Sequence, residues 1–101
     1  YVANVVQANL LAMTADNVSG MTMNAACHRA VTLNQLVVHL NRILGTSIDA
    51  IHDAPRSGDI RHSLADIEYA KEALGYTPLV GFEDGLRLSV QALLEAQHEP
   101  L

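Results

Sequence analysis

The sequence predicts a small, mostly helical α/β domain with two short strands. Half of its 101 residues are hydrophobic, aromatic residues make up only 4%, and tryptophan is absent, so the core has to be aliphatic, which favours packed helices. Four stretches repeat apolar residues every three or four positions, the period of a helix. Two shorter stretches alternate apolar and polar residues, as strands do.

The first predicted element is an amphipathic helix over residues 1–15. Its apolar residues recur at helical spacing, while Asn4, Gln7 and Asn9 fall largely on other faces. No capping residue precedes the helix, so we expect the chain to be cut from something longer, or to be unusual at its N-terminus. The apolar face consists of Val2, Val5, Val6, Leu10 and Met13.

A short strand over residues 21–26 is predicted next, followed by a helix over residues 32–45. Thr32 and Gln35 have the spacing of a capping box, and Gly45 can end the helix in a left-handed conformation. We expect this helix to bury one stripe, made of Leu33, Leu36, Val37, Leu40, Ile43 and Leu44.

The second strand is predicted in residues 47–55 and ends at Pro55. A helix capped by Asp66 and stopped by Gly75 follows a polar loop, with Ile67, Ala70 and Leu74 on one face. The last helix covers residues 82–97. Two short strands are marginal alone, so we expect them to extend another sheet. The last helix is expected to bury Phe82, Leu86, Val90, Leu93 and Leu94.

The length and charge of the chain exclude several classes of function. A chain of this length forms one domain, and its formal charge of −5 argues against general nucleic-acid binding, which needs a basic face. The single cysteine excludes an internal disulfide. No apolar run reaches the roughly 18 residues of a membrane span, and no signal peptide is visible, so we expect a cytoplasmic protein without a membrane partner.

The loop "PRSGDIRHSLADI", residues 55–67, is the main candidate for chemistry. Gly58 permits a tight turn from which Arg56, Asp59 and Arg61 project. A guanidinium matches a phosphate with paired hydrogen bonds, and a carboxylate accepts hydrogen bonds from sugar hydroxyls. The alternative is a solvated loop in which Arg56 pairs with Asp59, and composition alone favours this alternative.

Several segments in order resemble one enzyme family. The segments are "YVANVVQANLLA", "MNAACHRAVTLNQLVVHL", "PRSGDIRHSLADIEYAKEALGYTP" and "FEDGLRLSV". Together they resemble the C-terminal portion of extended short-chain dehydrogenase/reductase enzymes, the NAD-dependent nucleotide-sugar epimerase/dehydratase family. Within this family, the residues of these segments most closely resemble the UDP-N-acetylglucosamine 4-epimerases of polysaccharide biosynthesis. The resemblance implies that residues 1–101 are the nucleotide-sugar-binding C-terminal lobe.

The resemblance also implies site residues. Arg56 would contact the diphosphate of a UDP-sugar and Asp59 its ribose, with Arg61 and Ser63 as accessory residues. The chain departs from the family pattern in several places: Ala3 stands where an acid is expected, and Gly81 stands where a serine or threonine is usual. Cys27, His28 and Arg29 occupy positions where glycines are common.

The catalytic and cofactor motifs of such enzymes are absent from this sequence. No glycine-rich turn joins a strand to a helix, so the chain offers no site for NAD, the cofactor of the resembled family. Tyr69 and Lys71 lie two residues apart and do not form a Tyr-x-x-x-Lys pair. We therefore expect no catalytic residue here and a weak UDP-sugar binder without epimerase activity of its own; whether the chain counts as an enzyme stays open.

Two other interpretations remain. The five histidines do not have the spacing of metal ligands. We interpret Cys27 as a small buried apolar residue rather than a nucleophile. A rival function is a truncated structural or interaction module that forms homo-oligomers through the apolar face left by a missing cofactor domain. The expected partners are thus a UDP-sugar, the cofactor domain, or a second copy of the chain.

Overall fold

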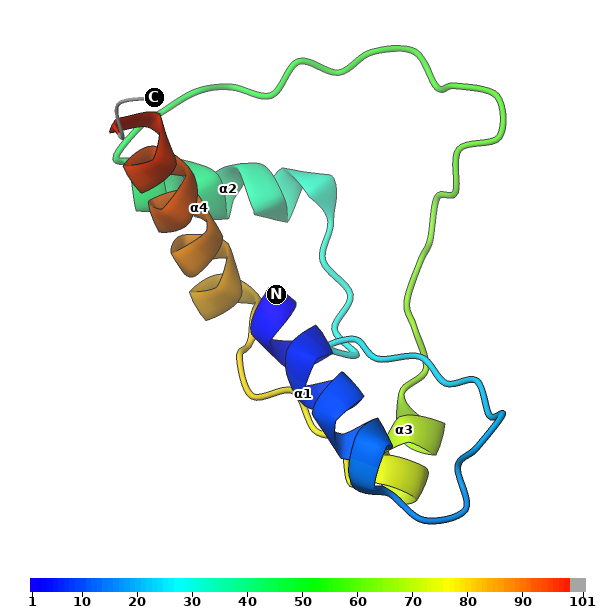
Figure 1. Ribbon diagram of the computed structural model, residues 1–101. Coiled ribbons are helices and arrows are strands. Elements are labelled where there is room, and N and C mark those ends of the chain that lie inside the picture. Colours follow the sequence, from blue (N-terminus) through cyan, green and yellow to red (C-terminus); the bar gives the residue numbers. More distant parts are fainter. Residues whose placement is uncertain (99–101) are drawn as a thin grey trace. The chain divides into compact units, whose positions relative to one another are not determined.

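The computed structural model describes residues 1–98 and contains four helices in that range (Figure 1). These are α1 (Val2–Thr14), α2 (Leu33–Leu44), α3 (Glu68–Leu74) and α4 (Phe82–His98). No residue between 1 and 98 belongs to a strand. The described chain is all-helical, and the predicted α/β class is wrong.

Both predicted strands are extended segments without a ladder partner. An alternating pattern suits any extended backbone, whereas a strand also needs a neighbouring backbone to bond with. In the second segment, Ile48 bonds instead to a side chain: its N–H donates to Asn41 Oδ1 at 3.1 Å, and its carbonyl accepts from Asn41 Nδ2 at 2.8 Å. In the first segment, the Ala26 carbonyl accepts from the Tyr76 hydroxyl at 2.9 Å.

The chain divides into two units. Unit 1 comprises Tyr1–Arg29 and the segment from Ala65 onward, and unit 2 comprises Ala30–Leu64. In unit 1, α1 contacts α3. The core of this unit combines two small alanines, one from each of these helices, with two larger side chains. It contains Ala8, Ile67, Ala70 and Tyr76, with Leu11, Met23, Ala26 and Leu74 packed against it.

The face that α1 buries is not the predicted one. Asn4 and Ala8 are its buried residues, and the predicted apolar face is exposed. Asn4 is buried because its amide bonds to the backbone of Leu79 and Val80, an interaction that hydrophobic periodicity cannot reveal. The exposed residues are Val2, Val5, Val6, Leu10 and Met13.

Unit 2 is organised by local bonds around α2. The predicted capping box is confirmed: the Gln35 N–H donates to Thr32 Oγ1 at 3.0 Å, and the Thr32 N–H donates to Gln35 Oε1 at 2.9 Å. Gly45 ends the helix with φ 66°, as predicted. The predicted buried stripe is wrong, however, because α2 has no buried residue and Leu33 is 80% exposed.

The last two helices confirm part of the prediction. Gly75 ends α3 with φ 67°, and Ile67 and Ala70 are buried as expected. In α4 the buried residue is Gly85, where an added Cβ would lie 2.8 Å from Tyr1 Cβ. Phe82, Leu86 and Val90 are only partly buried, and Leu93 and Leu94 are exposed, so the buried face predicted for α4 is wrong.

Candidate functional site

The predicted binding loop has its residues 55–64 in unit 2, where all of them are exposed, and its residues 65–67 in unit 1. Its centre is a tight turn closed by two bonds between Arg56 and Asp59. The Asp59 N–H donates to the Arg56 carbonyl at 3.2 Å, and the Arg56 N–H donates to Asp59 Oδ2 at 3.1 Å. Gly58 makes the turn possible with φ 86°. Pro55 and Gly58 thus produce the bend that the sequence predicts.

The turn holds the Asp59 carboxylate through the backbone of Arg56. Between these two residues the structure records no side-chain ion pair within residues 1–98, so the loop is not locked by a guanidinium–carboxylate contact. Arg61 and Ser63 follow on the same exposed segment. Arg56 and Asp59 are therefore brought together by the turn, whereas Arg61 and Ser63 are merely nearby in sequence.

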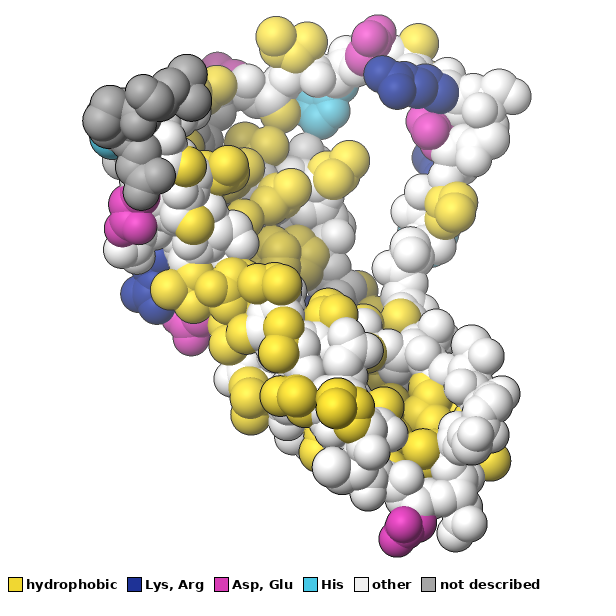
Figure 2. Space-filling model, in the orientation of Figure 1, with side chains coloured by type: hydrophobic (Ala, Val, Ile, Leu, Met, Phe, Trp, Pro, Cys, Tyr) yellow, Lys and Arg dark blue, Asp and Glu magenta, His cyan; other side chains and the backbone are white. Residues whose placement is uncertain are grey.

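Charge is distributed unevenly between the units. Unit 2 contains three basic and three acidic residues, so the chain's net charge of −5 belongs to unit 1. In Figure 2, dark blue and magenta side chains occur together on the extended part of unit 2, which is green in Figure 1. An anionic ligand is repelled less by unit 2 than by unit 1.

A cavity lies elsewhere, in unit 1. It has a volume of about 550 Å³ and lies beside α1, the loop that follows α1, and α3. None of the four predicted binding residues lines it. Its lining mixes apolar residues, such as Ala8, Met13 and Leu74, with polar ones, such as Asn9, Ser19 and Asn24.

Asn4 holds unit 1 together. Its Oδ1 accepts from the N–H groups of Leu79 at 2.9 Å and Val80 at 3.0 Å, and its Nδ2 donates to the Val80 carbonyl at 2.8 Å. Nδ2 also lies 3.5 Å from Cys27 Sγ. One buried amide therefore connects α1 to segments 23 and 76 residues away along the chain. Sequence reasoning missed it, because an asparagine among apolar residues resembles a surface position.

Tyr76 is the second residue that the sequence did not identify. It is fully buried, and its hydroxyl donates to the Ala26 carbonyl at 2.9 Å. Burial raises the pKa of the Tyr76 phenol, and the charge interaction with Cys27 raises it further. The sequence signal that could have identified Tyr76 is the "LGYTP" segment, in which a tyrosine directly follows a helix-ending glycine.

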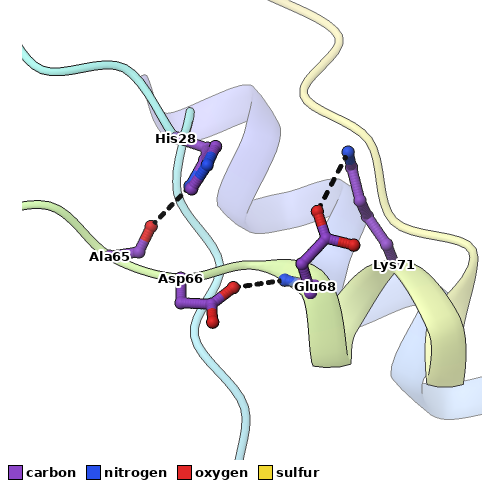
Figure 3. Close-up of polar contacts among 5 residues, drawn as sticks. All are labelled: His28, Ala65, Asp66, Glu68 and Lys71. Carbon is purple, nitrogen blue, oxygen red and sulfur yellow. Dashed lines mark hydrogen bonds and ion pairs between the residues drawn. The ribbon is translucent and has the colours of Figure 1, made fainter.

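Polar contacts also fix the entrance to α3 (Figure 3). His28 Nδ1 lies 3.0 Å from the Ala65 carbonyl, and Asp66 Oδ1 accepts from the Glu68 N–H at 2.9 Å. The N-cap residue is Ile67 and not Asp66 as predicted, because the helix begins one residue later; Asp66 still accepts a hydrogen bond from the first turn. His28 has φ 50°, in the left-handed region that favours glycine. A glycine would adopt this backbone conformation without strain.

The described residues do not fit NAD. Three of the glycines with positive φ lie after a helix or in a loop: Gly45 and Gly75 end α2 and α3, and Gly58 lies in the polar loop. The N-terminus of α4 has Glu83 and Asp84 in its first turn, which disfavours a pyrophosphate there. Within residues 1–98 no group of three His, Cys, Asp or Glu side chains could hold a metal ion, and no helix could span a membrane.

Comparison with known proteins places the chain beside one kind of enzyme. No family model matches it. It is 30% identical over 87 residues to the protein named "Putative UDP-glucose 4-epimerase" in Methanocaldococcus jannaschii. Its structure matches the crystal structure of UDP-glucose 4-epimerase with UDP-glucose from Thermotoga maritima, with a TM-score of 0.88 and 39% identity over 97% of this chain.

The chain is similar to UDP-glucose 4-epimerases. It spans only 27% of the Methanocaldococcus protein and 31% of the Thermotoga chain. The comparisons support the resemblance to the epimerase family and not the UDP-N-acetylglucosamine subtype, since both relatives are named for UDP-glucose.

Proposed function

We propose that this chain is the substrate-binding portion of a UDP-sugar 4-epimerase and holds the UDP moiety through the turn at Arg56 and Asp59. In this proposal the Arg56 guanidinium binds the diphosphate and the Asp59 carboxylate accepts hydrogen bonds from the ribose. Arg61 and Ser63 contribute accessory contacts. The observation that carries the proposal is the exposed turn at Arg56 and Asp59, in a chain that matches a UDP-glucose-bound epimerase.

The turn suits a ligand with a phosphate next to a sugar. Its backbone fixes the Asp59 carboxylate through Oδ2 only, and the Arg56 side chain remains at the surface. A guanidinium forms paired bonds with phosphate oxygens, and a carboxylate accepts from hydroxyl groups, so adjacent residues of these two kinds can bind adjacent parts of a nucleotide. Because Arg56, Asp59, Arg61 and Ser63 are all exposed, water competes for every such bond, and we expect weak affinity from this chain alone.

The role of the chain in the reaction is positioning. Holding a nucleotide fixes the attached sugar near groups supplied by the rest of an enzyme. NAD, the cofactor of the resembled family, would supply hydride transfer from a portion of the protein outside this chain. We therefore expect no epimerase activity from residues 1–101 alone, and a cytoplasmic role in making sugar precursors for polysaccharides.

The proposal is tested by titrating the isotope-labelled chain with UDP, UDP-glucose and UDP-N-acetylglucosamine while following backbone amide NMR signals. We expect shifts confined to residues 55–63. Loss of one charge-assisted contact should weaken binding about tenfold or more, so both Arg56→Ala and Asp59→Asn should do so. No change at these residues in a folded chain would contradict the proposal.

Two matched controls lie in the same unit. Arg42→Ala removes the same charge from an exposed position at the end of α2, and Asp49→Asn neutralises an exposed carboxylate outside the turn. Both should leave the affinity for UDP unchanged. Equal weakening by Arg42→Ala would indicate general charge attraction. Comparison of the two sugars tests the UDP-N-acetylglucosamine preference, which predicts tighter binding of the acetylated sugar.

A further inference from the structure

The chain leaves unit 1 after Arg29 and returns to it at Ala65. One hydrogen bond joins these two points of unit 1. His28 Nδ1 lies 3.0 Å from the carbonyl oxygen of Ala65, which is 37 residues away along the chain (Figure 3). Because a carbonyl oxygen can only accept, Nδ1 carries a hydrogen and donates it. A single imidazole therefore ties the place where the polar loop ends to the place where unit 2 begins.

The backbone of His28 is strained, and its neighbours hold it in that conformation. His28 has φ 50°, a left-handed value that is uncommon outside glycine. On one side of it, Cys27 Sγ lies 3.7 Å from the Val80 carbonyl oxygen. On the other side, Arg29 Nη2 lies 3.6 Å from Glu83 Oε1. Strain of this kind persists only where the surrounding structure maintains it, and it is concentrated at functional sites.

The His28 bond is the first anchor that the loop meets after its tight turn. Within the described residues 1–98, no hydrogen bond is recorded for residues 60–64, which follow the turn closed at Asp59. Ala65 is then held by His28. Without this bond the unanchored stretch would lengthen toward Ile67, which is buried in the core of unit 1. The bond therefore limits how freely the last part of the loop can move.

We propose that His28 is a positioning residue for the nucleotide: by holding the Ala65 carbonyl, it fixes the end of the loop that presents Arg61 and Ser63 to a nucleoside diphosphate. This inference rests on the proposed function and adds a residue of unit 1 to it. A loop that is free at this end adopts more arrangements, and the apparent affinity falls with the fraction of chains that are competent to bind. His28 thus acts through the loop and does not touch the ligand.

The test compares His28→Asn with His28→Asp in the 101-residue chain. Both residues tolerate a left-handed backbone, and both carry a polar atom at the position of Nδ1 along the side chain. Asparagine can place an N–H donor there, whereas an ionised aspartate can only accept. In NMR titrations with UDP, we expect His28→Asn to bind as the wild type does and His28→Asp to bind about three- to tenfold more weakly. His28→Gly, which removes the ring without backbone strain, should weaken binding similarly.

Two controls separate positioning from charge and from general stability. Asn17→Asp makes the same exchange at another exposed left-handed position of unit 1, with φ 60°, and should leave the affinity for UDP unchanged. Ser63→Ala should weaken binding in the wild type but add little in His28→Gly, because residues that act through one another are not additive. Loss of stability alone would leave the two effects additive. Circular dichroism checks that each variant keeps its helices.

The outcomes distinguish this inference from the proposed function. If the wild type binds UDP and both His28→Asp and His28→Gly bind it equally well, the role of His28 is overturned and the proposed function stands. Additive losses in the double variant, no loss in Ser63→Ala, or equal weakening by Asn17→Asp would also overturn that role. A folded wild-type chain that shows no shifts with UDP would overturn both. If His28→Asp does not fold, His28→Gly decides between these outcomes.

Discussion

Unit 1 and unit 2 use side-chain hydrogen bonds over very different distances along the chain. In unit 1, Asn4 bonds to Val80, 76 residues away, and Tyr76 bonds to Ala26, 50 residues away. In unit 2, the bonds of Thr32, Asn41 and Asp59 reach no more than seven residues. Unit 1 has a buried core, whereas no residue of unit 2 is buried.

This contrast separates two ways of specifying structure. Local bonds fix where a helix begins and ends, and α2 shows that they do so without burial. Buried long-range bonds decide which faces meet, and they make unit 1 sensitive to single changes. Substitutions should therefore have larger and more cooperative effects in unit 1 than in unit 2.

The largest effect is expected for Asn4→Ala. The change removes the three hydrogen bonds that Asn4 makes with Leu79 and Val80, and each such bond contributes about 1 kcal/mol. We expect unit 1 to lose about 3 kcal/mol or more in urea unfolding followed by circular dichroism. Asn9→Ala, at an exposed position of the same helix, should change stability little. Similar losses in both variants would contradict the role of Asn4.

Tyr76→Phe should have an intermediate effect of about 1–2 kcal/mol, because it leaves the Ala26 carbonyl without its donor. The raised pKa of Tyr76 adds a pH dependence. The folded chain favours the neutral phenol, so this contribution is complete below the ordinary pKa of 10.0 and is lost as the pH rises through the raised pKa. We expect wild-type stability to fall above about pH 10 more steeply than that of Tyr76→Phe. If urea titrations at alkaline pH showed the same pH dependence of stability for the wild type and Tyr76→Phe, the contribution of the Tyr76 phenol would be contradicted.

The smallest effect is expected for Thr32→Ala in unit 2. Loss of the cap costs about 1 kcal/mol and should fray the first turn of α2 only. Amide hydrogen exchange should speed up in the residues that begin α2 and stay unchanged in α1 and α3. Faster exchange throughout unit 1 would show that the two units are more strongly coupled than their bonding patterns indicate.

The same contrast explains what the sequence could predict. The ends of α2 and α3 depend on Thr32, Gln35, Gly45 and Gly75, which act on neighbouring backbone, and these were predicted correctly. The strands were wrong because alternation does not specify a pairing partner. The buried face of α1 was wrong because Asn4 is buried by bonds to residues far along the chain, which no local pattern contains.

The candidate site divides in the same way. The turn at Arg56 and Asp59 follows from Pro55 and Gly58, so its shape could be predicted locally. Its ligand could not, because affinity depends on which other groups surround the nucleotide. The resemblance to epimerases supplied that part of the interpretation, and the NMR titration tests it without assuming it.

The environment of Cys27 gives this chain a built-in reporter. The chain has no tryptophan and only this cysteine, whose partly buried Sγ lies beside the amide of Asn4 and 3.7 Å from the Val80 carbonyl. A thiol reagent can react at full speed only after this arrangement separates. The rate of chemical labelling therefore rises when the folded chain opens at this junction, and a ligand that tightens unit 1 would slow the reaction even if it never touches the sulfur.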